Sequence, residues 1–579
     1  MSGEEPPTGH GIEPGSDPYA AERSGQQAEQ ERVLVNSAVM AAGTVVSRMS
    51  GFVRSALLAA ALGVSLHADL FNISNTIPNM LYILLAGGVV NAVLVPQLVR
   101  AMRHDPDGGE AYTNRIITLA GGFLAVVTVL LVAAAPWVMD VFLAPCYDRA
   151  SMADERESVI MFARFCLPQV FFYGMYVLVG QILNARGRFG PMMWAPIANN
   201  VISVAVLVIY LFVFGPAKGA EVFGAYTPGQ ELLLGVGSTL GIVAQFVILV
   251  PYLRSTGFRY RPRFDFVGTG LGHTFRLGMW TVLFVIVNQL AYTVVVRLAS
   301  SGTATCSGGS TDGTGYTVYS STFLIMMVPH SIVTVSLATA ILPRLAARAA
   351  GDDLPGIARS LSETLRSALA VVIPFALLMP LISLDVAHVI WGYGAAADDF
   401  AAYAPSLSLF GIGLVFFTVH YLMLRGFYAL ERNRTVFWIQ CAVAATNIVA
   451  AVVLVRATNA EETSPSLVVA YTAAYAVGAA ISYAVLRRLL GGLRTPTLVR
   501  FLVRLMIAAG LATALAAALA ALVNRLDGDP SRLVAVVALV LVGTVDVVAF
   551  VLLARLLRLH EVTAVVDTVT RRLPLPRRR

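Results

Sequence analysis

The chain has 579 residues, of which 57% are apolar and only 13% charged, and its mean hydropathy is +0.73. Soluble domains carry close to a quarter charged residues, so this composition excludes a soluble globular domain and indicates a polytopic membrane protein. The formal charge of +7 therefore belongs to loops and tails and does not indicate a nucleic-acid partner.

The first 32 residues are polar and lack the apolar core of a signal peptide, so we expect a disordered cytoplasmic tail. From residue 33 onward, apolar runs of about 20 residues or more recur, each long enough to cross a ~30 Å hydrocarbon core. We predict an all-α membrane protein with about fourteen transmembrane helices, over residues 34–63, 68–100, 115–142, 158–185, 192–215, 231–254, 276–300, 317–347, 364–384, 402–427, 435–456, 466–487, 500–523 and 532–556.

Basic residues are distributed unevenly between the two sets of loops. If both termini are cytoplasmic, the six inner loops hold 21 arginines and the C-terminal tail holds seven more. The seven outer loops together hold seven basic residues. This positive-inside bias predicts that both termini are cytoplasmic.

Two arginines stand inside the first span, in the stretch "VVSRMSGFVRSALLAAALG". Arg48 is expected roughly 20 Å from the inner end of its helix, near the midplane, where an unpaired charge is costly. Arg54 lies about 9 Å further along the helix. Either both pair with Asp69 at the start of the second span, or they line a wet cavity and bind an anion. A guanidinium group binds phosphate through its planar fork, which favours a phosphorylated ligand.

Other polar residues inside the spans have a structural and a functional interpretation. Asn72 and Asn79 follow Asp69 along the second span, and Asn199 and Asn200 lie in the fifth. Asparagine in a helix bundle usually joins helices, and the alternative is contact with a sugar or peptide. Asp546 in the last span is expected to pair with Arg504, with a proton-coupling role as the alternative.

Cysteines and histidines show no metal-ligand spacing, and no cofactor is expected. Acidic and histidine residues form no cluster suited to catalysis at a membrane face, so an enzyme is the least favoured class. The spans expected to be seventh, eleventh and twelfth contain no deep carboxylate, and sodium coupling through them is unsupported.

A short internal similarity divides the chain. "VLVPQLVR" ends the second span and "AILPRLAAR" ends the eighth, and each span has an earlier proline, Pro78 or Pro329, expected to kink it. Interrupted helices in corresponding positions are typical of transporter repeats. We therefore expect a tail over 1–32, an N-lobe over 33–256, a C-lobe over 257–490, two further helices over 491–558 and a basic tail over 559–579.

The segment from Ser47 to Met102 resembles the MurJ (MviN) family, the lipid II flippases of bacterial peptidoglycan synthesis. The resemblance is carried by the start "SRMSGFVR", the following Asp69, the pair Pro78–Asn79 and the "VP" that ends in Pro96. Weaker similarity is present in "LPQVFFYGMYVLVGQILNARGRFGPMMWAPIANN", "AILPRLA" and "LRGFYALERNRT", and the likeness covers roughly residues 33–560.

The resemblance implies a MATE-like fold with two six-helix lobes around a cationic cavity and two C-terminal helices that carry a polyprenyl tail. It implies that Arg48, Arg54 and Asp69 match positions that the family needs for function. We expect Arg48 and Arg54 to hold the diphosphate of lipid II, and Asp69 to position an arginine or shift its charge balance. The chain departs from the family at two points where other members carry arginine: Tyr82 and Ile83 follow the Pro–Asn pair, and the eighth span has none around Leu324.

We therefore predict a flippase of the bacterial cytoplasmic membrane that moves lipid II to the outer leaflet by alternating access, with membrane lipids and cell-wall synthesis proteins as further partners. The predicted substrate-binding residues are Arg48, Arg54, Asp69, Asn72, Asn79, Tyr82, Asn199 and Asn200. The alternatives are export of another polyprenyl-linked oligosaccharide or an amphipathic drug, and a non-transporting scaffold for cell-wall enzymes.

Overall fold

The computed structural model describes residues 43, 46–84, 95–265, 271–304, 313–526 and 531–563. Within these ranges the backbone is helical almost throughout and contains no strand, so the all-α prediction is confirmed. Twelve helical segments of the described ranges are long and apolar enough to span a membrane. The predicted spans 34–63 and 68–100 include residues outside these ranges, so the count of fourteen is not confirmed.

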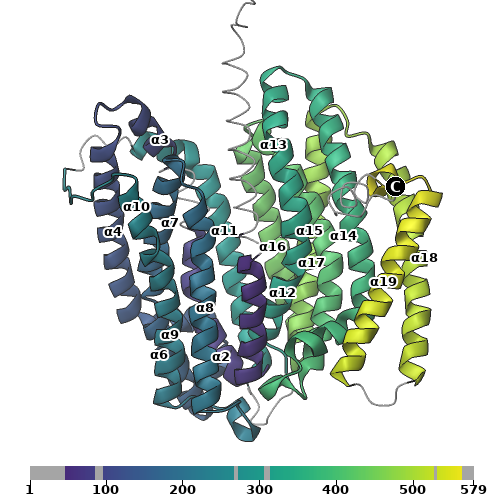
Figure 1. Ribbon diagram of the computed structural model, residues 1–579, viewed down its shortest axis with the longest axis horizontal. Helices are drawn as coiled ribbons and strands as arrows, with labels where there is room; N and C mark the ends of the chain where they lie inside the picture. The colour runs from purple at the N-terminus through teal and green to yellow at the C-terminus, as the bar shows by residue number, and fades with distance from the viewer. Residues whose placement is uncertain are drawn as a thin grey trace, which may run out of the picture.

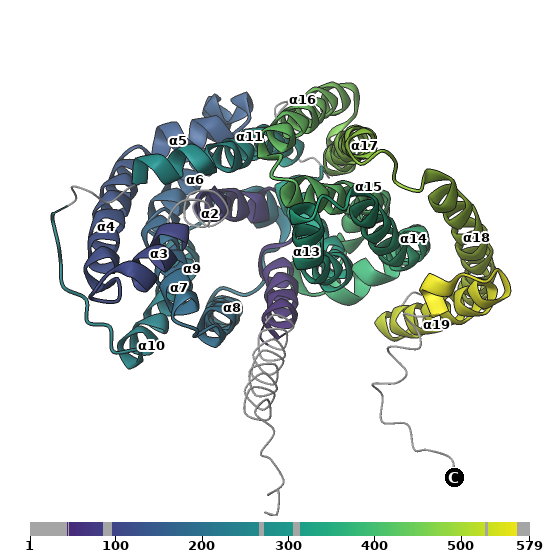
Figure 2. The ribbon, with the colours of Figure 1, turned by 90° about the horizontal axis from the view of Figure 1, so that it is seen from above.

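The helices form two lobes that stand side by side, with one more pair of helices beside the second lobe (Figures 1 and 2). The helical residues 46–62 lie between the lobes, α2–α10 form the N-lobe and α11–α17 the C-lobe, and the pair α18 and α19 packs against α14. The bounds are α2 Leu66–Ile83, α3 Val95–His104, α4 Glu110–Ala133, α5 Ala135–Phe142, α6 Ala153–Cys166, α7 Gln169–Ala185, α8 Gly190–Val213, α9 Pro228–Val247, α10 Leu249–Ser255, α11 Leu271–Thr303, α12 Tyr316–Pro329, α13 Val335–Ala350, α14 Leu354–Trp391, α15 Tyr403–Ala429, α16 Asn433–Ala457, α17 Thr463–Leu489, α18 Thr495–Leu526 and α19 Arg532–Leu556.

Four predicted spans are divided within the described residues. Single-residue turns at Ala134 and Ile248 separate α4 from α5 and α9 from α10, inside the spans predicted over 115–142 and 231–254. The other two divisions occur next to prolines. The span predicted over 158–185 is divided into α6 and α7 by a turn at residues 167–168, where Pro168 cannot donate a backbone hydrogen bond. The span predicted over 317–347 is divided into α12 and α13 by the π-helical turn His330–Thr334, directly after Pro329. Pro78, by contrast, lies inside α2, which continues to Ile83.

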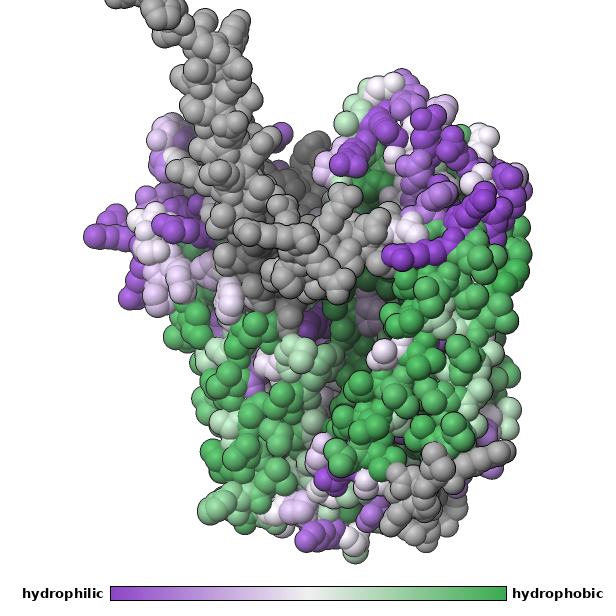
Figure 3. Space-filling view, turned by 45° about the vertical axis from the view of Figure 1, so that its right-hand side comes forward, coloured by the Kyte–Doolittle hydropathy of each residue, from purple (hydrophilic) through white to green (hydrophobic). Residues whose placement is uncertain are grey.

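The two ends of the bundle differ in character. We call the end with the α3–α4, α10–α11 and α13–α14 connections the arginine-rich end, and the opposite one the far end. Hydrophilic residues gather at the arginine-rich end, above a broad apolar band on the flanks of the molecule (Figure 3). Phe123 of α4, Phe212 of α8 and Val540 of α19 are between 61% and 91% exposed. An exposed apolar belt of this extent suits contact with lipid rather than water.

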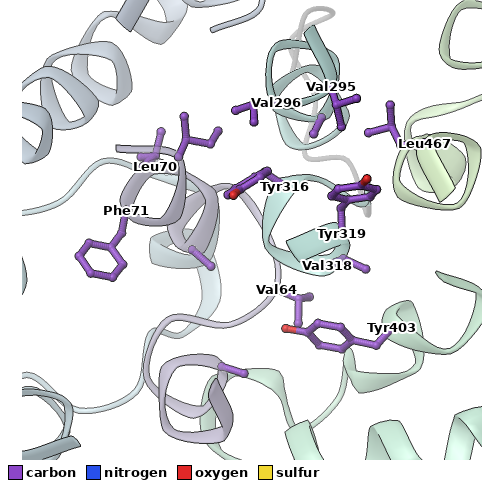
Figure 4. Packing of buried hydrophobic residues seen from close by; sticks show 14 of the residues in the cluster. Val64, Leu70, Phe71, Val295, Val296, Tyr316, Val318, Tyr319, Tyr403 and Leu467 are labelled. Atoms are coloured by element: carbon purple, nitrogen blue, oxygen red, sulfur yellow. The ribbon is translucent and has the colours of Figure 1, made fainter. Parts of the chain in front are cut away.

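The apolar core shows where the lobes join. At the far end one buried cluster includes side chains of both lobes, among them Leu70 of α2, Val295 of α11 and Tyr319 of α12 (Figure 4). At the arginine-rich end there are two separate clusters, one within α3, α4, α7, α8 and α10, and the other within α13–α19. The lobes therefore share a core at the far end, whereas each has its own core at the arginine-rich end.

Candidate functional site

Arg48 and Arg54 both lie on the helix that runs between the lobes. Arg48 is exposed and Arg54 is half-buried, close enough to the Tyr173 hydroxyl of α7 to interact with it electrostatically. Among the described residues, no carboxylate oxygen lies within 4.0 Å of either guanidinium group. The ion pair with Asp69 that the sequence left open is therefore not formed, and both cations remain available to an anionic ligand.

Asn200 fixes the helix that carries these arginines. Its side-chain amide, which is 7% exposed, donates hydrogen bonds to the Ser47 carbonyl oxygen and to Ser50 Oγ, both at 2.9 Å. Ser47 and Ser50 flank Arg48, so this contact with α8 sets the rotation and depth of the helix at that point. Asn200 thus acts here as a helix-to-helix contact, the structural interpretation of a polar residue in a bundle.

Asn199 serves the packing of α8 on α9. A Cβ atom at Gly241 of α9 would lie 2.3 Å from Asn199 Oδ1, so the two helices approach closely because residue 241 has no side chain. The Oδ1 atom also accepts a hydrogen bond from Ser203 Oγ at 3.4 Å. Like its neighbour, Asn199 contributes to the geometry of the N-lobe.

Asp69 has a different place from the one predicted. It is fully buried in the first turn of α2, and its carboxylate accepts hydrogen bonds from Thr303 Oγ1 at 2.7 Å, from the Tyr316 backbone N–H at 3.0 Å and from the Thr317 backbone N–H at 2.6 Å. The latter two groups are the free donors at the start of α12, where a negative charge is favoured. Asp69 therefore binds the N-terminus of a C-lobe helix, and no arginine of the described residues forms an ion pair with it.

Two further hydrogen bonds extend this contact along α2. Asn72 Nδ2 donates to Thr317 Oγ1 at 2.9 Å, and Thr76 Oγ1 is 2.5 Å from the hydroxyl of Tyr316. We call Asp69, Asn72 and Thr76 with their partners Thr303, Tyr316 and Thr317 the far-end latch. It joins the N-lobe to the C-lobe beside the shared core of Figure 4.

The remaining predicted residues of α2 lie nearer the arginine-rich end. Asn79 is exposed, whereas Tyr82 is half-buried against α7, with its ring 4.9 Å from that of Tyr173 and 6.4 Å from that of Tyr176. Tyr173 thus packs against Tyr82 and is close enough to Arg54 to interact with it electrostatically. A cluster of three tyrosines, Tyr82, Tyr173 and Tyr176, therefore lies next to the half-buried Arg54.

The sequence did not indicate Tyr173 or the C-lobe partners of the latch. Tyr173 is one of several aromatic residues in "VFFYGMY", and nothing local distinguishes it from its neighbours. Thr303 and Thr317 lie 234 and 248 positions from Asp69, and only the tertiary fold brings them together.

The expected pairing of Asp546 with Arg504, between α19 and α18, is not formed. Asp546 is 3% exposed and accepts a hydrogen bond from Thr513 Oγ1 at 3.1 Å, so its partner on α18 is a hydroxyl. Among the described residues, no ion pair joins Asp546 to Arg504.

A helical bundle with an apolar belt, two lobes joined at one end, and uncompensated arginines between them defines a membrane transporter of the two-lobed MATE-like class. Solved structures agree with this fold. A structure titled "Lipid II flippase MurJ, inward closed conformation" superposes with a TM-score of 0.67 at 14% identity, covering 89% of this chain and 98% of that one. An inward-facing MATE multidrug resistance transporter of the MOP superfamily superposes with a TM-score of 0.57 at 14% identity, covering 78% and 96%.

Sequence comparisons assign the family within that class. The family model described as "Lipid II flippase MurJ" matches residues 58–537. A protein of Haemophilus influenzae named "Probable lipid II flippase MurJ" is 23% identical over 408 residues, which cover 68% of this chain and 75% of that protein. A protein of the same name from Rhizobium meliloti is 25% identical over 400 residues, covering 69% and 71%. The chain belongs to the MurJ family, and it is a multi-pass membrane protein.

Proposed function

We propose that this protein flips lipid II, the lipid-linked peptidoglycan precursor, from the inner to the outer leaflet of the bacterial cytoplasmic membrane, without catalysing a chemical reaction. Family membership supports the substrate class. The single structural observation that carries the proposal is the pair of arginines between the lobes with no acidic partner among the described residues. A charged side chain inside a membrane is costly unless something compensates its charge. Since no described residue does so for these arginines, an anionic ligand is the best explanation.

The charge distribution supports the proposed direction of transport. The positive-inside rule assigns the arginine-rich end to the cytoplasm, and each lobe has its own core at that end. The structure then corresponds to a state that receives substrate from the inner leaflet, with the far-end latch closed. Release requires the lobes to part at the far end and approach at the other, which is alternating access.

Arg48 and Arg54 would bind the diphosphate of lipid II. Arg48 is exposed, and Arg54 lies on the same helix against Tyr173, so the two can contact one extended anion from different depths. The apolar surfaces of α18 and α19, where Leu515 and Val540 are 55% and 62% exposed, would accommodate the polyprenyl chain. Membrane potential acting on bound charge is a sufficient driving force, at about 2.3 kcal/mol per charge per 100 mV.

Complementation of a flippase-depleted cell tests the proposal, scored as the lipid II that becomes accessible to an extracellular probe. We expect the wild-type chain to restore accessibility, and Arg48→Ala and Arg48→Lys to fail at matched membrane levels, because a lysine does not reproduce the planar fork. Arg164→Ala is the matched control, since Arg164 is an exposed arginine of α6. A wild-type chain that is well expressed yet restores no accessibility would contradict lipid II transport and favour another polyprenyl-linked substrate.

A further inference from the structure

A second cluster with an uncompensated cation lies in the C-lobe, in the "LRGFYALERNRT" stretch. Arg425 is near the end of α15, and its Cζ atom lies 4.3 Å from the ring centroid of Tyr421 and 5.7 Å from that of Tyr428. Its Nε atom is enclosed without a hydrogen-bond partner. No carboxylate oxygen of the described residues lies within 4.0 Å of its guanidinium group. Aromatic faces attract a cation but do not satisfy its N–H donors.

His330 lies against the same tyrosine. It is 5% exposed, its ring is 4.8 Å from that of Tyr421 in an edge-on arrangement and 4.6 Å from that of Phe417, and its Nδ1 atom is enclosed without a partner. Arg425 is close enough to interact electrostatically with the His330 ring. Two nitrogen atoms without partners are therefore buried around one tyrosine, where native structures nearly always provide partners.

Local backbone geometry places His330 there. The residue opens the π-helical turn between α12 and α13, in which the Val335 backbone N–H donates to the His330 carbonyl oxygen, five residues earlier. Thr334 Oγ1, at the end of the turn, lies 3.4 Å from Thr418 Oγ1 of α15. Such π-helical turns occur frequently at functional sites, because the extra residue per turn redirects a side chain.

We propose that Arg425 and His330 form a phosphate-binding site in the C-lobe, separate from Arg48 and Arg54. A phosphate oxygen would accept hydrogen bonds from the Arg425 guanidinium group and from His330, while Tyr421 and Tyr428 hold the guanidinium plane. The site itself follows from the two enclosed nitrogen atoms without hydrogen-bond partners. The phosphate could belong to a lipid-linked diphosphate or to a membrane phospholipid. We choose the lipid-linked diphosphate, and only this choice rests on the proposed function.

The binding test uses the full chain in phosphatidylcholine nanodiscs, with farnesyl diphosphate and inorganic diphosphate as probes and calorimetry as the readout. An Arg48→Ala, Arg54→Ala background removes the first pair of cations. In that background we expect Arg425→Gln to weaken binding of both probes by at least about tenfold, because a charge-assisted bidentate contact is lost. Arg434→Gln is the matched control, since Arg434 is exposed and its Cζ lies 5.6 Å from the ring of Trp280. We expect this control to leave affinity unchanged.

Two further variants keep the test decisive if Arg425→Gln does not fold. Arg425→Lys keeps the charge without the fork, and His330→Phe keeps the ring packing without the nitrogen atoms, so each should weaken binding to a smaller extent. Unchanged affinity in the folded variants would overturn the site. Nanodiscs that contain phosphatidylglycerol identify the source of the phosphate. If this lipid competes with farnesyl diphosphate, and the competition is lost in Arg425→Gln, the site binds a phospholipid.

The outcomes also separate this site from the proposed function. If Arg48→Ala abolishes lipid II transport while Arg425→Gln changes neither transport nor diphosphate binding, the C-lobe site is refuted and the flippase proposal stands. If the wild-type chain transports no lipid II but Arg425→Gln still weakens diphosphate binding, the site is supported and a different phosphorylated lipid is its ligand.

Discussion

Arg54 and Asp69 are both charged residues of the bundle interior, and their surroundings assign them opposite tasks. Asp69 is fully buried and accepts three hydrogen bonds, two of them from the free N–H groups of a helix start. Its charge is therefore compensated by the protein itself. Arg54 is half-buried beside Tyr173, and no carboxylate oxygen of the described residues lies within 4.0 Å of its guanidinium group. A compensated charge stabilises a conformation, whereas an uncompensated one is free to bind a ligand.

This difference predicts that Asp69 controls the closed state of the far end. Asp69→Ala leaves three donors without an acceptor, and we expect it to destabilise the closed far end by about 3 kcal/mol, which raises the open population by up to about a hundredfold. Cys146 is a native reporter, since it is 4% exposed within the shared core of the two lobes. With the other cysteines replaced by serine, its labelling by a maleimide should accelerate in Asp69→Ala.

Asp546→Ala is the control for that experiment. It removes a buried carboxylate from α19, outside the contact between the lobes, and deprives only Thr513 of a partner. We expect labelling of Cys146 to stay at the wild-type rate in this variant. Equal rates in Asp69→Ala and wild type would show that the latch does not hold the far end closed.

At the scale of the residue, the sequence identified charges but not their partners. The cost of a charge in hydrocarbon singles out Arg48, Arg54 and Asp69 without any structural knowledge. The partner of Asp69 is the start of α12, more than 230 positions away, and no local pattern encodes that contact. Arg425 lies inside the span predicted over 402–427, and α15 continues past it to Ala429, but no local pattern indicated the aromatic rings around it.

At the scale of the element, the sequence predicted helices well and their interruptions poorly. A span of apolar residues must be helical in lipid because all its backbone groups need internal partners, so length and hydropathy suffice. Interruptions depend on packing as well. Pro329 is followed by a π-helical turn that Thr418 of α15 contacts, yet α2 continues through Pro78. A proline therefore allows an interruption, and the neighbouring helix decides its form.

The contact of α8 with α9 shows how closely the N-lobe helices are fitted. Gly241→Ala would introduce a Cβ atom 2.3 Å from Asn199 Oδ1, and we expect a loss of about 1–3 kcal/mol from overpacking. Adding Asn199→Ala should restore part of that loss, because it removes the atom that clashes. Thermal unfolding in detergent measures both effects.

Gly510→Ala in α18 provides the comparison, because a Cβ atom there meets nothing within 4 Å. We expect it to be neutral or slightly stabilising, since alanine favours a helix over glycine. If Gly241→Ala unfolds at the wild-type temperature, α8 and α9 can move apart without cost, and Asn199 does not set their spacing.

At the scale of the whole molecule, the division of the apolar core is what the proposed alternating access requires. One cluster unites the lobes at the far end, while each lobe has its own cluster at the arginine-rich end. Each lobe can therefore move as a unit if the shared contacts between α2 and α12 are broken. Sequence predicted two lobes from a short repeat around Pro96 and Pro343, but it could not say which end is closed, because that depends on contacts between segments distant in the chain.

We expect the two ends of the bundle to be accessible from opposite sides of the membrane. In a cysteine-less background, we expect an impermeant maleimide to label Arg188→Cys in inverted membrane vesicles only, since Arg188 is exposed at the arginine-rich end between α7 and α8. Arg149→Cys, exposed at the far end, should be labelled in right-side-out spheroplasts only. The physical reason is the bias of arginine toward one set of loops, which fixes orientation during insertion. The reverse pattern would place the arginine-rich end outside the cell, and the structure would then represent a state that releases substrate instead of one that receives it.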